Sequence, residues 1–140
     1  MAAEIKVKNL PSGYQSIITN GKHTIIGDEP IKNKGTDLGL APAELILGGL
    51  AMCKAATIRC VARIKGWDIR DINVELKQEI ERGKNRVIYN HIKINIEIEG
   101  DITSIQRKEL LKQTDKCYVH KMLEGDWDIA PSKDLTKMIR

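Results

Sequence analysis

The pattern of apolar and polar positions divides the chain into short strands, one strongly apolar helix, a long hairpin and a second helix. Near the N-terminus, Ile5 and Val7 alternate with lysines, which predicts a strand, and Asn20-Gly21 is a typical hairpin turn. Residues 27–39 are rich in Gly, Asp, Lys and Asn, so we expect a loop there. The N-terminal part of the chain is therefore predicted to form short strands joined by turns.

The most apolar segment follows, and it predicts a long buried helix from Pro42 to Lys65. Proline suits the first turn of a helix, where its missing N–H costs nothing, and Gly66 suits the C-terminal cap. The half from Leu45 to Met52 is apolar almost all around, so it needs cover on most sides. Two interior glycines cost about 1 kcal/mol each relative to alanine, so Gly48-Gly49 predict that another element approaches the helix closely.

After Trp67 the hydrophobic period changes to two, as expected for strands. Apolar side chains alternate with polar ones before and after a turn at residues 82–85. The apolar side chains are at positions 72, 74, 76 and 80 before the turn, and at 88, 92, 94, 96 and 98 after it. This alternation predicts an antiparallel pair with one covered face. The apolar helix is the obvious cover for that face.

A second helix is predicted by the capping-box spacing of Thr103 and Gln106, with Leu110, Thr114 and Cys117 on one of its stripes. Residues 126–129 predict a last short strand. Together the elements predict an α+β fold in which a curved antiparallel sheet wraps around the long buried central helix. One sheet covers only one side of a helix that is apolar all around. We therefore expect a homodimer, in which a second subunit covers the other side.

Composition is that of an ordinary soluble globular protein, with 41% hydrophobic and 30% charged residues among 140. The longest apolar-rich stretch, residues 38–52, is interrupted by Pro42 and Glu44 and is shorter than the roughly 18 residues of a membrane span. We therefore expect a cytoplasmic protein with no membrane partner. The net charge of +4 arises from 23 basic residues intermixed with 19 acidic ones. Nucleic-acid binding requires clustered basic charge, so we expect none, and this is the weakest alternative.

The three cysteines are the candidates for chemistry. Cys53 and Cys60 are seven residues apart on the predicted helix, about 10 Å along its axis, whereas a disulfide requires Cα atoms within about 7 Å. Cys117 lies on another element and can approach either one, so spacing leaves Cys53–Cys117 and Cys60–Cys117 both open. Without further information, three buried structural thiols are the simpler interpretation. A zinc site is disfavoured, because Cys117 and His120 have no second ligand pair at suitable spacing.

Two separated segments resemble the signatures of the OsmC/Ohr family. The run from Gly39 to Cys53 reads GLAPAELILGGLAMC, in which a Pro and a Glu open a helix that carries a cysteine. The segment 115–121, DKCYVHK, resembles the second cysteine signature. The order of predicted elements is similar over nearly the whole chain. The resemblance implies a single OsmC-like domain over residues 1–140 and an intertwined homodimer.

The resemblance also implies a thiol-dependent peroxidase that reduces organic hydroperoxides. In that family the cysteine matching Cys53 attacks the peroxide as a thiolate and becomes a sulfenic acid, and the cysteine matching Cys117 condenses with it to a disulfide. A dithiol, typically lipoyl-linked in the organic-hydroperoxide branch, reduces the disulfide. Glu44 is the candidate for the active-site acid, and Cys60 is expected to be a core residue. This chemistry needs no metal and no flavin or other cofactor.

The sequence departs from the family pattern at two positions that bear on catalysis. The better-known branches carry an Arg in the N-terminal strands that stabilises the thiolate, whereas the first arginine here is Arg59. Burial among Leu and Ala raises the pKa of a thiol, so a reactive Cys53 requires another cation nearby. The candidates are Lys22, His23, Lys54 and Arg59. The family's acid usually follows the helix-opening Pro directly, whereas here Ala43 follows Pro42 and Glu44 comes one residue later. On an ideal helix, Glu44 then faces away from Cys53.

The missing Arg supports an alternative function with the same fold. In that alternative the chain is a non-enzymatic OsmC-like protein that binds an apolar or thiol-containing ligand. The favoured hypothesis remains the peroxidase, with organic hydroperoxides as substrates, because an apolar helix suits the alkyl tail of such a substrate.

Overall fold

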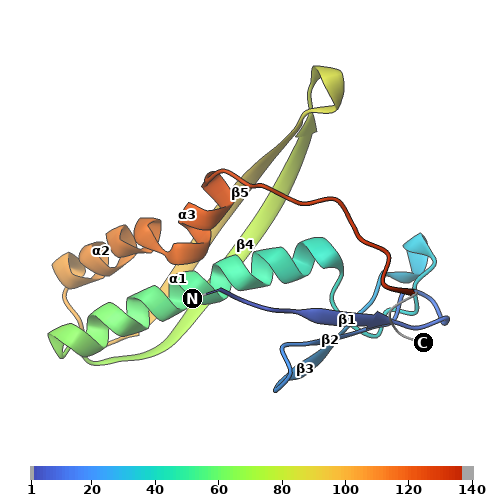
Figure 1. The fold of residues 1–140 in the computed structure, drawn as a ribbon. Helices are drawn as coiled ribbons and strands as arrows, with labels where there is room; N and C mark the ends of the chain where they lie inside the picture. Colours follow the sequence, from blue (N-terminus) through green and yellow to red (C-terminus); the bar gives the residue numbers. More distant parts are fainter. Residues whose placement is uncertain (1, 137–140) are drawn as a thin grey trace.

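The computed structural model describes residues 2–136, and its elements follow the predicted order along the chain (Figure 1). The helices are α1 (Pro42–Lys65), α2 (Ser104–Gln113) and α3 (Tyr118–Glu124). The strands are β1 (Lys6–Asn9), β2 (Ser16–Thr19), β3 (Thr24–Gly27), β4 (Ile69–Arg82) and β5 (Ile88–Gly100). Three short 3₁₀ turns connect them: η1 (Ile31–Asn33), η2 (Lys84–Arg86) and η3 (Thr114–Lys116). The predicted α+β class, with a long helix and antiparallel strands, is confirmed.

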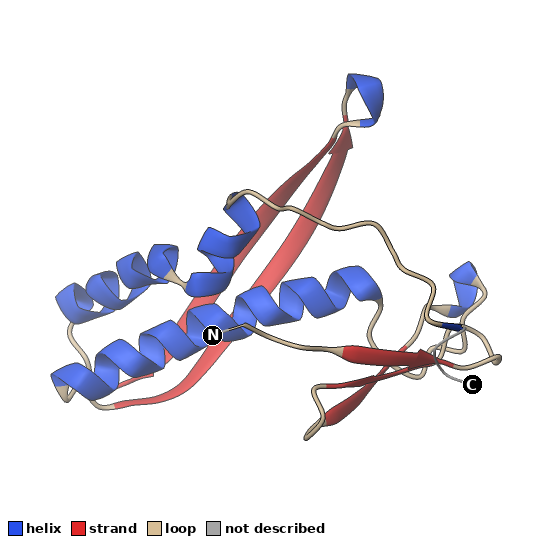
Figure 2. Ribbon diagram, viewed as in Figure 1, coloured by secondary structure: helices blue, strands red, loops and turns tan. Residues whose placement is uncertain are grey.

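The strands form two separate sheets, and this differs from the one curved sheet expected from the sequence. Strands β1, β2 and β3 form an antiparallel meander, and β4 and β5 form a long antiparallel hairpin. The hairpin register opposes Ile72 with Ile98 and Leu76 with Ile94, so the predicted apolar face exists. Figure 2 shows the hairpin passing behind the helices and its tip extending beyond them. In the single chain, therefore, the hairpin covers α1 over only part of its own length.

Helix α1 begins and ends where the sequence predicts. Pro42 lies in its first turn, and the Ala41 N–H donates a hydrogen bond to the Glu44 carboxylate at 2.9 Å. Gly66 ends the helix in the left-handed region at φ 69°, and its N–H donates to the last carbonyls. Four residues spaced by four positions form the buried stripe: Leu50, Lys54, Ile58 and Ala62. This stripe faces β4, α2, η3 and α3.

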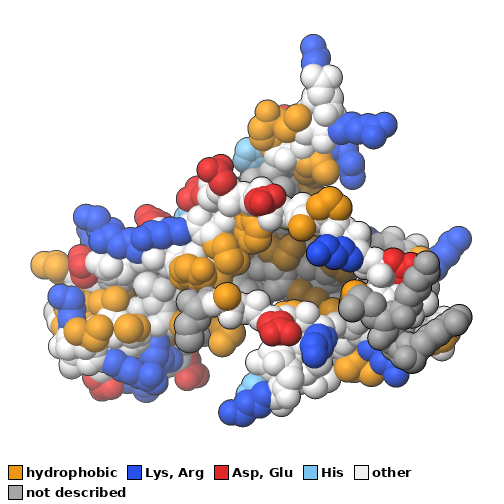
Figure 3. All heavy atoms as spheres, viewed as in Figure 1, with side chains coloured by type: hydrophobic (Ala, Val, Ile, Leu, Met, Phe, Trp, Pro, Cys, Tyr) orange, Lys and Arg blue, Asp and Glu red, His pale blue; other side chains and the backbone are white. Residues whose placement is uncertain are grey.

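The opposite side of α1 is uncovered in the single chain. Met52 is 75% exposed and Ile64 80% exposed. A Cβ atom added to Gly48 or Gly49 would meet no heavy atom of the described chain within 4 Å. No element of the described chain makes the close approach predicted at these glycines, so that approach stays a prediction for a second subunit. On the face drawn in Figure 3, hydrophobic side chains border a hollow.

The core lies where α1, α2 and the root of the hairpin meet. Ile58, Ala62, Ile98 and Leu110 form one buried cluster. The predicted capping box of α2 is confirmed, because Thr103 accepts the Gln106 N–H at 3.1 Å and Gln106 accepts the Thr103 N–H at 2.9 Å. The predicted stripe is confirmed only in burial: Leu110, Thr114 and Cys117 are all buried, but α2 ends at Gln113, so Thr114 lies in η3 and Cys117 is the N-cap of α3. This stripe brings Cys117 onto α1.

Two predictions about single segments are wrong. Cys60 is exposed rather than in the core, because it stands about 200° around α1 from the buried Ile58. Residues 126–129 form no strand. A strand needs a free sheet edge to pair with. This segment instead continues from α3 as extended chain, with Trp127 and Ile129 exposed (Figure 1).

A buried carboxylate organises the loop between β3 and α1. Asp28 is 3% exposed and accepts the N–H groups of Tyr14, Glu29 and Leu38 at 2.7 to 3.2 Å. The Thr36 hydroxyl, also hydrogen-bonded to this carboxylate, contributes most to holding its pKa far below the ordinary value. These bonds fix the turn that leads the chain into α1, and so they help to position the helix that carries Cys53.

Candidate functional site

The fold brings two cysteines from distant parts of the chain together. Cys53 is half-buried in the middle of α1, and Cys117 is 1% exposed as the N-cap of α3. The Val119 N–H donates to Cys53 Sγ, and the next N–H, of His120, donates to Cys117 Sγ, both at 3.4 Å. Successive backbone groups at the start of α3 thus hold both sulfurs.

The two thiols have different environments. Burial raises the pKa of the Cys117 thiol, and a hydrogen bond with Cys53 and the charge of that residue raise it further. The His120 N–H and the Lys54 ammonium act in the opposite direction and lower it, but the net direction is upward. A raised pKa favours the protonated form of the thiol. Cys117 therefore keeps its proton at neutral pH.

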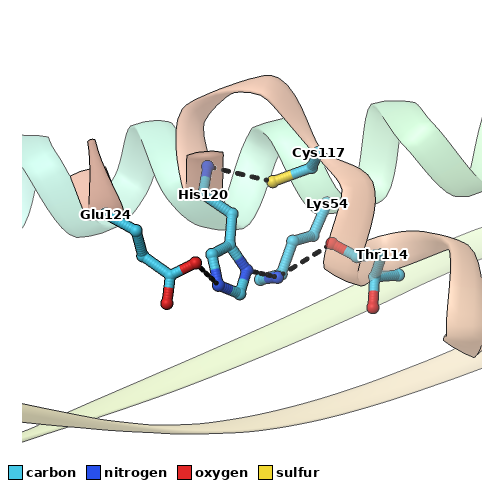
Figure 4. Close-up of polar contacts among 5 residues, drawn as sticks. All are labelled: Lys54, Thr114, Cys117, His120 and Glu124. Carbon is cyan, nitrogen blue, oxygen red and sulfur yellow. Dashed lines mark hydrogen bonds and ion pairs between the residues drawn. The ribbon is translucent and has the colours of Figure 1, made fainter. Parts of the chain in front are cut away.

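A buried lysine lies close to Cys117 (Figure 4). Lys54 is 1% exposed, and its Nζ donates to the Thr114 carbonyl and to His120 Nδ1, both at 3.0 Å. His120 Nε2 lies 3.0 Å from Oε1 of Glu124, one turn further along α3. A buried ammonium is tolerated only with such partners. The structure thus surrounds the lysine with acceptors and places it close enough to act on the pKa of Cys117.

The other three candidate cations lie elsewhere. Lys22 and His23 are exposed in the turn between β2 and β3, where their N–H groups bond to the Asn20 side chain. The Arg59 guanidinium donates to the Ile69 carbonyl at 3.4 Å. Among the four candidates, only Lys54 acts on the pKa of Cys117.

Glu44 does not lie at the cysteine pair of its own chain. Its side chain is exposed and caps the N-terminus of α1 through the Ala41 N–H. It precedes Cys53 by nine residues, which corresponds to about 14 Å along the helix. Cys60, seven residues beyond Cys53, is exposed and apart from the pair.

Glu124 is a site residue that sequence reasoning missed, and His120 was named there without a link to Lys54. The sequence signal for them was the spacing alone, because residues at i and i+4 on a helix face each other. Their approach to Lys54 depends on how α3 packs on α1, which spacing does not reveal. Within residues 2–136, no group of three His, Cys, Asp or Glu side chains could hold a metal ion.

A cavity of about 510 Å³ adjoins the site. Its apolar lining comes from α1, β5 and α3, and its polar lining is Gln78, Asn90, His120 and Glu124. The Gln78 amide donates to the Asn90 side chain at 2.8 Å across the hairpin. Neither sulfur lines this cavity, and His120 connects it to the cysteine pair.

Comparisons with known proteins agree with this fold. The family model of OsmC-like proteins matches residues 35–131. A similar structure is the OsmC-like protein of Mycoplasma pneumoniae, with a TM-score of 0.75, 21% identity and 89% of each chain covered. An organic hydroperoxide resistance protein OsmC from Legionella pneumophila has a TM-score of 0.67 and 16% identity, covering 89% of this chain and 90% of its own. OhrB, the organic hydroperoxide resistance protein of Bacillus subtilis, has a TM-score of 0.64 and 16% identity, covering 90% and 93%.

The family match spans more than half of the chain, so the protein belongs to the OsmC family. The OsmC/Ohr family that the two cysteine segments indicated is thereby confirmed. Comparison with curated proteins gave no match. Helix α1 is long and apolar enough to cross a membrane by length and composition, and its buried stripe packs against other elements of the fold.

Proposed function

We propose that this protein is a cytoplasmic thiol-dependent peroxidase that reduces organic hydroperoxides through Cys53 and Cys117. The observation that carries the proposal is that successive N–H groups of α3 hold the sulfurs of Cys53 and Cys117, from distant parts of the chain, with the buried Lys54 close enough to act on Cys117. Solved structures with a similar fold include organic hydroperoxide resistance proteins. A thiol pair of this kind supplies two electrons without a metal or flavin.

The proposed reaction begins at Cys53. Its thiolate attacks the terminal oxygen of the hydroperoxide, the O–O bond breaks, and Cys53 becomes a sulfenic acid while the alkoxide takes up a proton and leaves as an alcohol. The Cys117 thiol then attacks the Cys53 sulfur. An S–S bond forms, and the thiol proton leaves with the hydroxyl group as water. A dithiol, lipoyl-linked in our proposal, donates two electrons and two protons to restore both thiols.

The different environments of the two thiols support this division of roles. Cys53 is half-buried and therefore open to a peroxide, whereas Cys117 is 1% exposed. The raised pKa of Cys117 keeps the proton that must leave with the hydroxyl group in the second step. The aliphatic cavity next to His120 suits an alkyl tail.

The uncovered side of α1 supports a homodimer. Met52 and Ile64 are large apolar residues on that side, and the space above Gly48 and Gly49 is open. A second copy would cover this surface, and exposed apolar surface of this extent favours such an interface. Glu44 is remote from the pair of its own chain, so we propose that it serves the cysteine pair of the second subunit.

Steady-state turnover tests the proposal. Reduced protein is mixed with cumene hydroperoxide and either dihydrolipoamide or dithiothreitol, and loss of peroxide is followed. The peroxidase account expects turnover that Cys53→Ser abolishes and that Cys60→Ser, the matched control at an exposed thiol, leaves intact. Turnover that survives Cys53→Ser, or absence of turnover with either dithiol, would contradict it.

A second candidate function is favoured by one observation. The cavity beside His120 contains neither sulfur, so it is also suited to a non-enzymatic protein that binds an apolar ligand. Fluorescence titration with a long-chain fatty alcohol, together with the turnover assay, separates the two functions. Tight binding without turnover would support the non-enzymatic binding function.

A further inference from the structure

Three titratable side chains form one hydrogen-bonded row that ends close to Cys117 (Figure 4). The row runs from Glu124, which is exposed, through His120 to the buried Lys54. We propose that His120, oriented by Glu124, is a positioning residue that holds the Lys54 ammonium beside Cys53 and Cys117 and thereby controls their reactivity. The inference concerns the proposed redox pair and rests on the proposed function only in taking Cys53 as the attacking thiol.

The contacts fix the tautomer of His120. A charged lysine has donors only, so His120 Nδ1, at 3.0 Å from Lys54 Nζ, must present its lone pair. The ring proton then resides on Nε2, which donates to Glu124 Oε1 at 3.0 Å. Glu124 lies one helical turn after His120, and its bond sets both the ring orientation and the tautomer. The imidazole is therefore built to accept from the lysine.

The ammonium depends on that acceptor. Lys54 is 1% exposed, and a buried ammonium favours loss of its proton unless protein groups replace water. Two groups do so here, the Thr114 carbonyl and His120 Nδ1. Removing the imidazole halves this set of partners, which favours the uncharged amine. An uncharged amine gives no electrostatic support to a thiolate.

Protonation of His120 would have the same consequence. A proton on Nδ1 would oppose the Lys54 donor at 3.0 Å and bring two positive charges together. The titratable groups facing His120 are Lys54 from α1, Glu124 from α3 and the Cys117 thiol. The polar side chains that the hairpin strands contribute to the shared cavity are the neutral amides of Gln78 and Asn90. The protonation of His120 therefore depends on its two charged neighbours, Lys54 and Glu124.

Alkylation of Cys53 by iodoacetamide, measured against pH by mass spectrometry, tests this role. All variants carry Cys60→Ser, which removes the exposed third thiol. His120→Leu deletes the acceptor, whereas His120→Asn keeps an oxygen near the position of Nδ1. We expect His120→Leu to slow alkylation at neutral pH about tenfold and to move the midpoint to higher pH, since a bond to a charged group is lost. His120→Asn should restore most of the rate.

A matched control is available on the hairpin. His91 is exposed and lies 3.4 Å from Glu81, which is a similar His–Glu pair far from the cysteines in the sequence. His91→Leu should leave the alkylation profile unchanged. Thermal unfolding by circular dichroism verifies that each variant is folded at the assay temperature. An unchanged profile in folded His120→Leu, or an equal loss in folded His120→Leu and His120→Asn, would overturn the positioning role.

The outcome is separable from the peroxidase proposal, because alkylation uses no peroxide. If the His120 variants behave as expected but the wild type does not turn over hydroperoxide, the positioning role stands and the proposed function fails. If turnover occurs but the His120 substitutions leave the alkylation profile unchanged, the proposed function stands and the positioning role fails.

Discussion

Replacing Lys54 with methionine should separate the stability of the fold from the reactivity of its cysteines. Methionine has a similar length and carries no charge, so the change removes the ammonium with little loss of volume. Two hydrogen bonds from a charged group are lost, worth about 1.5 to 3 kcal/mol each. The cost of holding the ammonium out of water, several kcal/mol on the same scale, is also removed.

The two acceptors that lose the Lys54 ammonium still have other hydrogen-bond partners or access to water. The Thr114 carbonyl still accepts the Cys117 N–H at 3.3 Å. The His120 side chain is 28% exposed, so water can reach it. We therefore expect the free energy of unfolding of Lys54→Met to change by no more than about 1 to 2 kcal/mol in either direction.

Reactivity should respond far more strongly. An opposite charge near a thiol favours its ionised form by about 1 to 3 pKa units. Without the ammonium, the ionised fraction of the cysteine pair at neutral pH should fall about tenfold or more. Urea unfolding gives the stability, and alkylation of Cys53 in a Cys60→Ser background gives the reactivity. Lys112→Met, at an exposed position of α2, is the control for charge removal.

Two results would refute this reasoning. A loss of more than about 4 kcal/mol would mean that the ammonium is a structural requirement, since losses of that size are exceptional for one substitution. Unchanged alkylation in a stable Lys54→Met protein would mean that Lys54 is not the cation of the site.

Further outcomes follow from other contacts. Ile58→Ala, at a fully buried core position, should cost about 2 to 4 kcal/mol in urea unfolding, whereas Ile105→Ala, 79% exposed, should cost less than about 0.5 kcal/mol. The folded pKa of Asp28 lies below its ordinary value of 3.8, so the stability that the carboxylate contributes is present above 3.8 and is lost as pH falls through the folded pKa. The melting temperature of the wild type should therefore drop between about pH 5 and pH 2. Asp28→Asn should flatten that profile. Glu44→Gln keeps the capping acceptor and removes the charge, so it should lower peroxide turnover without lowering the melting temperature; unchanged turnover would contradict its proposed role at the second subunit's pair. Met52→Glu, on the uncovered side of α1, should convert a dimer to monomer in light scattering, and a monomeric wild type would contradict the proposed interface.

Local signals in the sequence predicted the elements well, because local physics determines them. The Pro42 start, the Gly66 end and the Thr103 capping box each depend on backbone groups a few residues away. The hairpin alternation survives in the register of β4 and β5. Those predictions needed no knowledge of the rest of the fold.

Features that depend on tertiary contacts were not predictable in the same way. The exposure of Cys60 depends on which stripe of α1 meets the hairpin, and periodicity is uninformative where a helix is apolar all around. Residues 126–129 alternate like a strand, but a strand also needs an edge to pair with. The two glycines of α1 predicted a close neighbour that the single chain does not supply.

The chemistry of the site was predictable only in part. Spacing left Cys117 free to pair with Cys53 or Cys60, and the packing of α3 on α1 brings it to Cys53. Lys54 was one of four candidate cations, and only the fold distinguishes it. His120 and Glu124 gave only an i, i+4 spacing, which is common on surface helices. Their relation to Lys54 exists only after two helices meet.

Stoichiometric oxidation tests the central claim most directly. Reduced protein is mixed in a stopped-flow instrument with one equivalent of cumene hydroperoxide, after which free thiols are counted and any disulfide is mapped by mass spectrometry. The account predicts rapid loss of two thiols as a Cys53–Cys117 bridge, with Cys60 remaining free. Three free thiols under excess peroxide, or a bridge that includes Cys60, would contradict it.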